Sequence, residues 1–240
     1  MTSYFQRYLA GEHEAVWAEL RAAGSISDAL TADCAAVATE TMRRVRRHVD
    51  RLAEQLTELG LRSQPLAPFR SPPTESDVAR LDELAAAIGG LPFALDACLR
   101  HVGRVWFAGD CVALGLYYED DVPPGVEQVL ADPLVLADVD YLSFSWAELL
   151  EIRAEEPDAG LLFELAPDEL HKAAFSGGTH DIPLPQRVAD PVLLGVLDRP
   201  GITLVEYLRL SIAWGGLPGW ATAPDRVPPA LTKLRAEPDF

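Results

Sequence analysis

Apolar residues recur at helical spacing through the first sixty positions of the chain. Between residues 4 and 20 they fall near every third or fourth position, with a break at Gly11. A second helix is predicted from Asp28 to Leu59, and from Val45 to Leu59 its apolar residues follow alternating steps of four and three, which is typical of a helix packed against a second helix. Gly60 then provides a helix stop. The pattern predicts a helical hairpin over residues 1–62.

Prolines interrupt this pattern in the next segment. Proline fixes φ and cannot continue a helix, so residues 63–73 are predicted to form a stiff connector between two domains. The prolines of this segment are Pro65, Pro68, Pro72 and Pro73.

The second part of the chain begins with two predicted helices. Thr74 or Ser76 can cap the first helix, Gly89 can end it, and Pro92 can occupy the first turn of the next. After Gly103 the apolar runs become short and are separated by Gly, Pro and Asp, which is typical of strands. The runs predicted as strands are "RVWFAG", "CVALGLYY", "PLVLADV", "LLFELAP", "HKAAF", "DIPLP" and "PVLLGVL".

Two more helices are expected among and after these strands. The segment "SWAELLEIRAEE" would be capped by Ser143 or Ser145, and a last amphipathic helix would begin at Thr203. The Pro-rich tail, residues 221–240, is expected to be extended. This order of elements predicts an α+β fold over residues 74–220, a mostly antiparallel sheet flanked by helices and preceded by the helical hairpin.

The negative charge of the chain is concentrated in its second part. The 240 residues carry a net charge of −17, with nine acids and nine bases in residues 1–74 and 28 acids and 11 bases in residues 75–240. This excess argues against nucleic-acid binding by the second part, because phosphates need basic partners. It suits a basic protein partner and would speed its approach, although many proteins are acidic for solubility alone.

One basic cluster lies in the second predicted helix. Acidic residues three or four positions away can pair with its arginines, which favours a solvated helix face. The alternative is that this face docks on the acidic part of the same chain or of a sister chain. A self-associating scaffold, a homodimer through the N-terminal helices, therefore stays open. The cluster consists of Arg43, Arg44, Arg46, Arg47 and Arg51.

No segment resembles a signal peptide, and no apolar run approaches the roughly 20 residues that span a bilayer. The three cysteines, Cys34, Cys98 and Cys111, have neither a pairing pattern nor metal-ligand spacing, which is typical of buried free thiols. We therefore expect a cytoplasmic protein with no membrane or nucleic-acid partner.

The stretch "FSGGTHDIPLP" carries the residue types of a catalytic loop. If the chain were an enzyme, Ser176 could be a nucleophile, with His171, His180 or Asp181 as base or orienting group. However, the GxSxG motif is missing, and the spacing of the histidines matches no metal signature. The sequence therefore leans against an enzyme, and we expect no cofactor and no metal.

A turn explains this stretch more simply. Its glycine pair can adopt positive φ at low cost, and its prolines suit an edge strand. The sequence predicts a strand that ends at Phe175, a turn over residues 176–179 and a strand over residues 181–184.

Two acidic clusters are candidate partner-binding residues. Glu119, Asp120 and Asp121 follow Tyr117 and Tyr118, and aromatic side chains beside charges are typical of interface anchors and rims. A second cluster contains Glu155 and Glu156. Solvated loop charges are the simpler interpretation of both.

The segment "DVARLDELAAAIGGLPFALDACLRHVGRVWFAG" resembles the opening of SUKH superfamily domains. The likeness extends over residues 74–220, through the later strands and the closing amphipathic helix, and leaves out the helical hairpin. The nearest carboxylate to the first helix end, Glu83, and the "VG" that ends the second helix depart from the usual pattern. The matching residues are Leu81, Leu84, Ile88, Gly89, Leu91, Pro92, Leu95, Leu99 and Gly103.

This resemblance implies an α+β domain without catalytic residues. Bacterial domains of this kind often act as immunity proteins that neutralise toxins, many of them basic nucleases, and a fungal relative helps to regulate cell-wall synthesis. We therefore expect a non-catalytic protein-binding module, with a toxin-neutralising immunity protein that occludes a basic partner as its specific form. The alternatives are a small-molecule enzyme with a cleft near His171, His180 and Asp181, and the self-associating scaffold.

Overall fold

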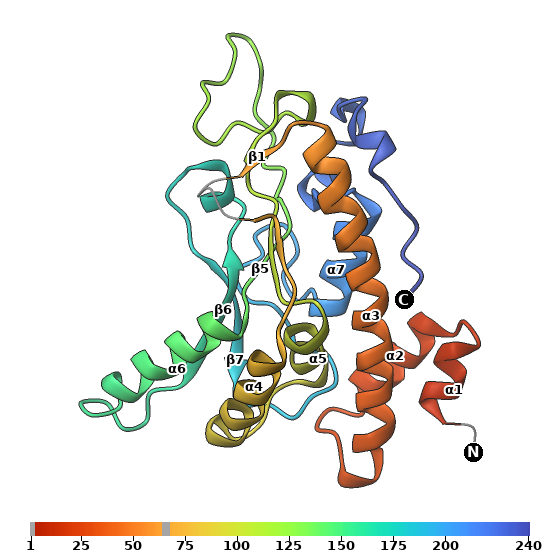
Figure 1. Cartoon of the computed structure of the whole chain (residues 1–240), viewed down its shortest axis with the longest axis vertical. Helices are drawn as coiled ribbons and strands as arrows, with labels where there is room; N and C mark the ends of the chain where they lie inside the picture. The colour runs from red at the N-terminus through yellow and green to blue at the C-terminus, as the bar shows by residue number, and fades with distance from the viewer. Residues whose placement is uncertain (1–2, 64–67) are drawn as a thin grey trace.

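The computed structural model describes residues 3–63 and 68–240 (Figure 1). The N-terminal part is helical, and the rest combines helices with short antiparallel strands, so the α+β prediction is confirmed. The helices are α1 (Tyr4–Leu9), α2 (His13–Ala22), α3 (Asp28–Glu58), α4 (Glu75–Ile88), α5 (Phe93–His101), α6 (Val139–Ile152) and α7 (Leu204–Ala213). The strands are β1 (Arg62–Ser63), β2 (Arg70–Ser71), β3 (Arg104–Trp106), β4 (Gly109–Asp110), β5 (Val135–Leu136), β6 (Leu161–Pro167) and β7 (Thr179–Leu184).

The long helix α3 has the bounds and the buried stripe that the apolar spacing predicts. Val45, Val49, Leu52 and Leu56 are buried along it. On another turn of this helix, Thr41 accepts a hydrogen bond from Trp17 of α2 (3.1 Å) and donates one to the hydroxyl of Tyr8 in α1 (2.9 Å). Both short helices are therefore fastened to α3.

The basic face of α3 is partly neutralised within the chain. Arg44 pairs with Glu40 (2.8 Å) and Arg46 with Asp50 (3.5 Å), as the spacing of three to four residues suggests. The carboxylate of Asp239, from the tail, contacts Arg47 (3.6 Å). Part of this face therefore docks on an acidic group of the same chain.

The helices that follow the connector start and stop at the predicted positions. Thr74 accepts a hydrogen bond from the backbone N–H of Asp77, whose carboxylate accepts in turn from the N–H of Thr74. Gly89 ends α4 in a left-handed conformation, and Pro92 lies directly before α5. Of the connector, residues 64–67 lie outside the described residues.

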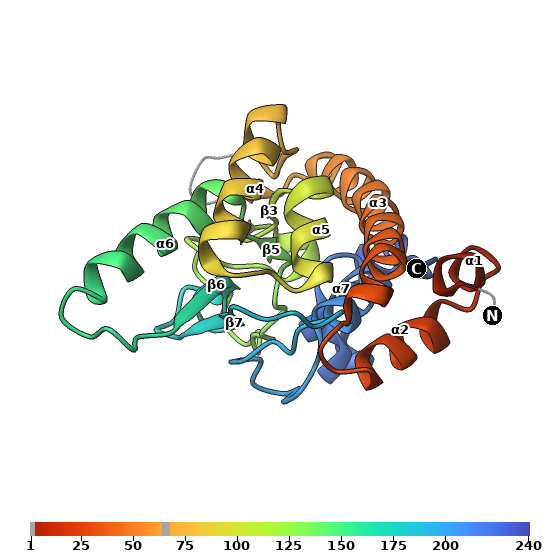
Figure 2. The same cartoon turned by 90° about the horizontal axis from the view of Figure 1, so that it is seen from below.

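The strands form small antiparallel sheets that together cross the middle of the molecule. One sheet has the order β2-β3-β5, another pairs β6 with β7, and a third pairs β1 with β4. The N–H of Ala137, just after β5, donates to the carbonyl of Leu165 in β6 (2.8 Å) and links the first two sheets. Helices α6, α4, α5 and α3 follow one another beside these strands, each packed on the next, and α6 projects away from the body (Figures 1 and 2).

Several predicted elements differ from the structure. The run "CVALGLYY" forms a 3-10 turn at Val112–Leu114, and "HKAAF" forms another at His171–Ala173. The run "PVLLGVL" makes only isolated bridges, through Val192 and Leu194. The first and third of these runs bury apolar side chains in the core without entering a continuous ladder, whereas the buried residue of "HKAAF" is Lys172.

Two further predictions about chain segments are wrong. Helix α6 begins earlier than expected, because Asp138 caps it by accepting from the N–H of Tyr141 (3.0 Å), and neither Ser143 nor Ser145 is the cap. The tail is not extended: it contains two 3-10 turns and the end of a third, and its residues Leu231, Leu234 and Phe240 are buried.

One continuous hydrophobic core runs through both parts of the chain. It joins Trp17 and Val45 from the N-terminal helices to Leu95, Phe163 and Tyr207 from the second part. The division at residues 63–73 thus separates segments of sequence and not separate cores. None of the helices in the described part combines the length and the apolar character that crossing a bilayer requires.

Candidate functional site

The loop between β6 and β7 contains the stretch with catalytic residue types. Strand β6 already ends at Pro167, so the predicted strand to Phe175 is wrong, and residues 168–178 form the connection. Asp168 organises this loop: its carboxylate accepts from the N–H of His171 (2.8 Å) and from the N–H of Gly178 (2.6 Å).

Gly177 of this loop is needed for a reason other than positive φ. Neither Gly177 nor Gly178 lies in the left-handed region. A Cβ at Gly177 would lie 2.2 Å from a carboxylate oxygen of Asp168, which is closer than non-bonded atoms can approach. The absence of a side chain therefore lets the carboxylate reach the loop backbone.

The four residues of the enzyme alternative do not converge. Ser176 is exposed, whereas His180 is completely buried. The ring of His171 is exposed, and its Nδ1 lies 3.0 Å from the carbonyl oxygen of Gly178. In residues 3–63 and 68–240 no hydrogen bond joins Ser176 to either histidine. Asp181 has one buried carboxylate oxygen without a hydrogen-bond partner.

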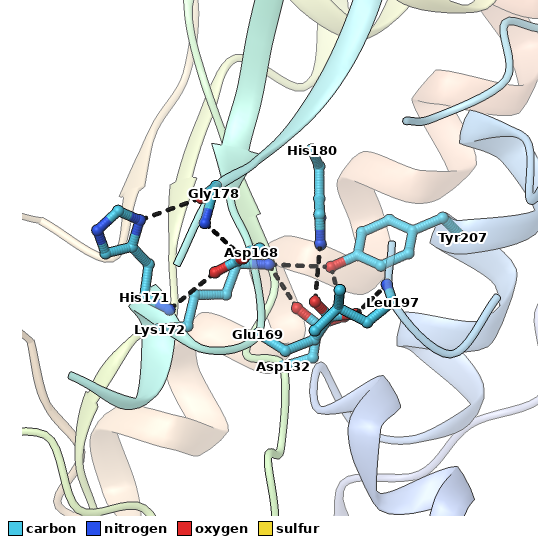
Figure 3. A network of polar contacts seen from close by, with 9 residues as sticks. All are labelled: Asp132, Asp168, Glu169, His171, Lys172, Gly178, His180, Leu197 and Tyr207. Carbon is cyan, nitrogen blue, oxygen red and sulfur yellow. Dashed lines mark hydrogen bonds and ion pairs between the residues drawn. The ribbon is translucent and has the colours of Figure 1, made fainter. Parts of the chain in front are cut away.

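His180 belongs instead to a buried polar network that the sequence did not suggest (Figure 3). Lys172 donates from Nζ to Asp132 (2.5 Å) and to the hydroxyl of Tyr207 (3.2 Å), and this hydroxyl donates to the other oxygen of Asp132 (3.0 Å). Glu169 accepts from the backbone N–H of Leu197 (3.2 Å) and lies 3.5 Å from Nε2 of His180.

Burial dominates the electrostatics of this network. Burial raises the pKa of Asp132, and the neighbouring ammonium of Lys172 offsets part of that rise. For Glu169, burial opposes ionisation, but the hydrogen bond from His180 and nearby positive charge lower its pKa overall. Burial, and then the charge of Asp132, raise the pKa of Tyr207 well above its usual range. Asp132 also has φ of +49°, in the left-handed region that non-glycine residues adopt at a cost.

The same network contains a possible donor set for a metal ion. One ligand atom each from Asp132, Glu169 and His180 lie within 4.8 Å of one another. Lys172, however, is already bound to Asp132 and supplies the positive charge that a metal would supply. The donor set therefore fits an internal ion pair better than a metal centre, and we derive no chemistry from it.

The two acidic clusters lie toward opposite ends of the molecule's long axis (Figure 1). Near the first, Asp110 accepts from the N–H groups of Tyr118, Glu119 and Asp120 (2.7 to 3.0 Å), and Asp120 also forms an ion pair with Arg62. Glu119 and Asp121 are exposed, whereas both tyrosines are half-buried.

The second cluster is exposed. Glu155 and Glu156 follow the end of α6, at the tip that projects from the body. The seven predicted partner-binding residues therefore do not form one patch, and their role in binding stays a prediction.

A groove of about 580 Å³ lies between α6 and the strands β3, β5 and β6. Trp106, Tyr141 and Phe144 are the aromatic side chains that line it, and Phe144 is 55% exposed. The remaining lining residues are Arg104, Val135, Leu136, Ala137, Asp138, Asp140, Glu164, Leu165, Ala166, Pro167, His171 and Thr179.

The charged groups of this groove differ in how they are paired. Asp140 forms an ion pair with Arg80 (2.5 Å), Asp138 caps α6, and the guanidinium of Arg104 lies over the ring of Trp106 (5.3 Å to the centroid). Glu164 accepts a hydrogen bond from the hydroxyl of Tyr141 (2.5 Å). No basic side chain of the described residues forms an ion pair with Glu164.

The projecting helix and β6 expose further apolar residues. Leu150 and Ile152 on α6 are about half exposed, as is Leu162 on the outward face of β6. A soluble monomer exposes contiguous large apolar residues mainly where something binds. The groove and its neighbouring face are therefore the best candidate for a functional site.

Sequence reasoning missed this groove entirely. The available signal was the apolar content of α6, where Tyr141, Phe144, Leu150 and Ile152 exceed what one buried stripe needs. Comparison of the chain with protein-family models, with curated proteins and with solved structures gives no match in any of the three. The site is therefore interpreted from its own geometry.

Proposed function

We propose that this chain is a non-catalytic protein-binding module that receives its partner in the groove between α6 and the strands. The observation that carries this proposal is the aromatic lining of an open groove, with the half-exposed Phe144 at its edge. Aromatic residues that become buried at the centre of a contact are the usual source of binding energy in protein interfaces.

The partner is a basic protein. Residues 75–240 carry 28 acids against 11 bases, and Glu148 and Glu151 are exposed on the helix that forms one wall of the groove. Such a field attracts a positively charged partner and accelerates its association at low salt. Glu119, Asp121, Glu155 and Glu156 would act in this long-range attraction, outside the groove.

In its specific form, the proposal is that of a toxin-neutralising immunity protein. The support is the resemblance of residues 74–220 to SUKH domains together with the acidic surface. The module would cover the basic cleft of a toxic nuclease and so block its access to nucleic acid. Purified partner that loses its activity on addition of one equivalent of this protein would support this form, and unchanged activity in the stable complex would exclude it.

Capture of the partner with a groove variant tests the docking site. Phe144→Asp places a charge on the rim of the groove, and Val112→Asp makes the same kind of change at a 65% exposed apolar residue outside it. Tagged proteins would be incubated at low and high salt with a lysate of cells that produce the chain, and bound proteins identified by mass spectrometry.

We expect one basic protein to be bound stoichiometrically by the unmodified protein and by Val112→Asp, and to be released at high salt. Phe144→Asp should lose it, because a carboxylate would have to be buried against the apolar lining. Equal capture by all three proteins would show that the partner docks elsewhere. Capture of no basic protein by any of them would contradict the binding function.

A further inference from the structure

We propose that Glu164 is a recognition site for a lysine or arginine side chain of the bound partner segment, with the apolar stem of that side chain on Phe144 and an apolar neighbour near Leu162. This inference rests on the proposed function and specifies which chemistry the groove selects. It assigns to Glu164 a role in specificity that no other described residue of the groove can take.

Glu164 occupies an outward-facing position on β6. Burial alternates along β6, so that Leu161 and Phe163 point into the core while Leu162 and Glu164 face outward. Glu164 therefore stands on the floor of the groove, and the aromatic residues Tyr141 and Phe144 of α6 line the same groove.

The carboxylate of Glu164 is held by a hydrogen bond and has no counter-charge among the described residues. Tyr141 holds one of its oxygens at 2.5 Å, and burial together with this hydrogen bond to Glu164 raises the pKa of Tyr141. The phenol fixes the carboxylate without neutralising it. The other two acids of the lining are already engaged, Asp140 by Arg80 and Asp138 by the start of α6. Glu164 is thus left to pair with an incoming cation.

The aromatic and acidic groups of the groove suit the two parts of a basic side chain. Lysine and arginine carry a long apolar stem below the charge, and this stem can lie on aromatic surface while the charged end reaches a carboxylate. Arg104 already shows such stacking in the groove, over Trp106. A partner residue can use the ring of Phe144 in the same way and present its charge to Glu164.

Leu162 adds a preference for apolar neighbours. It is 53% exposed and lies two residues before Glu164 on the same face of β6, about 7 Å away along the strand. A segment that places a basic residue at Glu164 therefore brings adjacent side chains near Leu162 and Phe144. The geometry thus selects a basic residue flanked by aliphatic ones.

Short peptides test this selectivity without knowledge of the natural partner. The probes are acetyl-Ser-Leu-Arg-Leu-Ser-amide, its lysine analogue, and the same peptide with Gln or Glu at the centre. Binding to the ¹⁵N-labelled full chain would be followed by NMR, with the indole N–H of Trp106 as reporter. The chain has five tryptophans, and comparison with the Trp106→Phe variant identifies this signal.

We expect the Arg and Lys peptides to shift the Trp106 signal and to bind about fivefold more tightly than the Gln peptide, since an ion pair at a partly exposed carboxylate contributes modestly. The Glu peptide should bind more weakly still. In Glu164→Gln the preference for Arg or Lys over Gln should vanish while binding of the Gln peptide persists. Glu54→Gln, which removes an exposed charge of α3 outside the groove, should retain the preference.

Other results separate the inference from the proposed function. If all four peptides bind equally, or if Glu164→Gln leaves the preference unchanged, the assignment of Glu164 is wrong although the groove still binds peptides. If no peptide shifts the Trp106 signal, both the assignment and the docking groove are contradicted. Tyr141→Phe gives a second measurement, because it frees the carboxylate oxygen without removing the charge and should keep the preference for basic peptides.

Discussion

Lys172→Met removes the only positive charge that contacts Asp132 in the buried network. The lysine side chain is completely buried, that of Asp132 is 5% exposed, and their charged atoms lie 2.5 Å apart. In the variant, Asp132 would keep only the hydroxyl of Tyr207 at 3.0 Å as a side-chain partner. A buried carboxylate without its counter-charge must be desolvated with little compensation.

The expected loss follows from this geometry. Removing one partner of a buried ion pair costs about 3–5 kcal/mol of unfolding free energy. Typical domains have about 5–15 kcal/mol in total, so the loss is a large part of the stability of the protein. Lys233→Met is a matched control, because it changes an exposed lysine, and it should alter the free energy by less than about 0.5 kcal/mol.

The pH dependence of the variant provides a second signature. Burial already raises the pKa of Asp132 in the folded protein, and loss of Lys172 removes a charge that lowers it. A carboxyl group whose pKa is higher in the folded than in the unfolded protein lowers the unfolding free energy least at low pH, where it is protonated. It lowers the unfolding free energy progressively more as the pH rises through its pKa in the folded protein. The loss of unfolding free energy in Lys172→Met should therefore be smaller at pH 4 than at pH 7.

Denaturant unfolding followed by circular dichroism at both pH values measures these differences. The double variant Asp132→Asn with Lys172→Met serves as a further check, since it removes both charges and should recover at least about 1 kcal/mol of the single variant's loss. A single-variant loss below about 1 kcal/mol, or a deficit that is equal at pH 4 and pH 7, would refute the argument that this ion pair is an essential buried element.

Three other predictions follow from local geometry. Gly177→Ala should lower the unfolding free energy by about 2 kcal/mol, because the new Cβ would meet the carboxylate of Asp168. Gly160→Ala places its Cβ in open space and should change the unfolding free energy little. Equal effects of the two variants in thermal denaturation would contradict the close approach at Gly177. Burial raises the pKa of Asp190 from 3.8 to about 6. Its contribution to stability is therefore present below about pH 4 and declines by about 3 kcal/mol as the pH rises through 6. Asp190→Asn should abolish this decline in unfolding free energies measured from pH 4 to 7, and NMR titration of Asp190 should give a midpoint near 6. Thr203→Ala should cost about 1 kcal/mol through loss of the cap on α7, measured as a lower denaturation midpoint, and an unchanged midpoint would show that the cap is dispensable.

The boundaries of α4 and the start of α7 could be predicted from the sequence because their signals are local. Thr74 and Thr203 each begin a helix with an acidic residue three positions later, and both form the expected reciprocal hydrogen bonds. Gly89 likewise ends α4 in a conformation that glycine adopts at low cost. These contacts join residues three or four apart, so that the surrounding structure is not needed to specify them.

Strand predictions succeeded only where partners were available. The run "LLFELAP" forms β6 with alternating burial, because β7 lies beside it. The run "HKAAF" has comparable apolar content but closes a 3-10 turn, since Asp168 binds the N–H of His171 at its start. Whether an apolar run becomes a strand depends on a neighbouring strand, and this neighbour is set by long-range packing.

By itself, the sequence determined the class of the fold, the caps of α4 and α7, the acidic charge and the residue types available for chemistry. Only the tertiary structure decided that His180 is buried beside Glu169 and that Lys172 meets Asp132 and Tyr207, which lie 40 and 35 residues away along the chain. The same holds for the groove, where α6 and β6 bring Phe144 and Glu164 to one surface. The physical reason is that desolvation and pairing depend on which groups share a volume, and residues distant in sequence share one only after the core has formed.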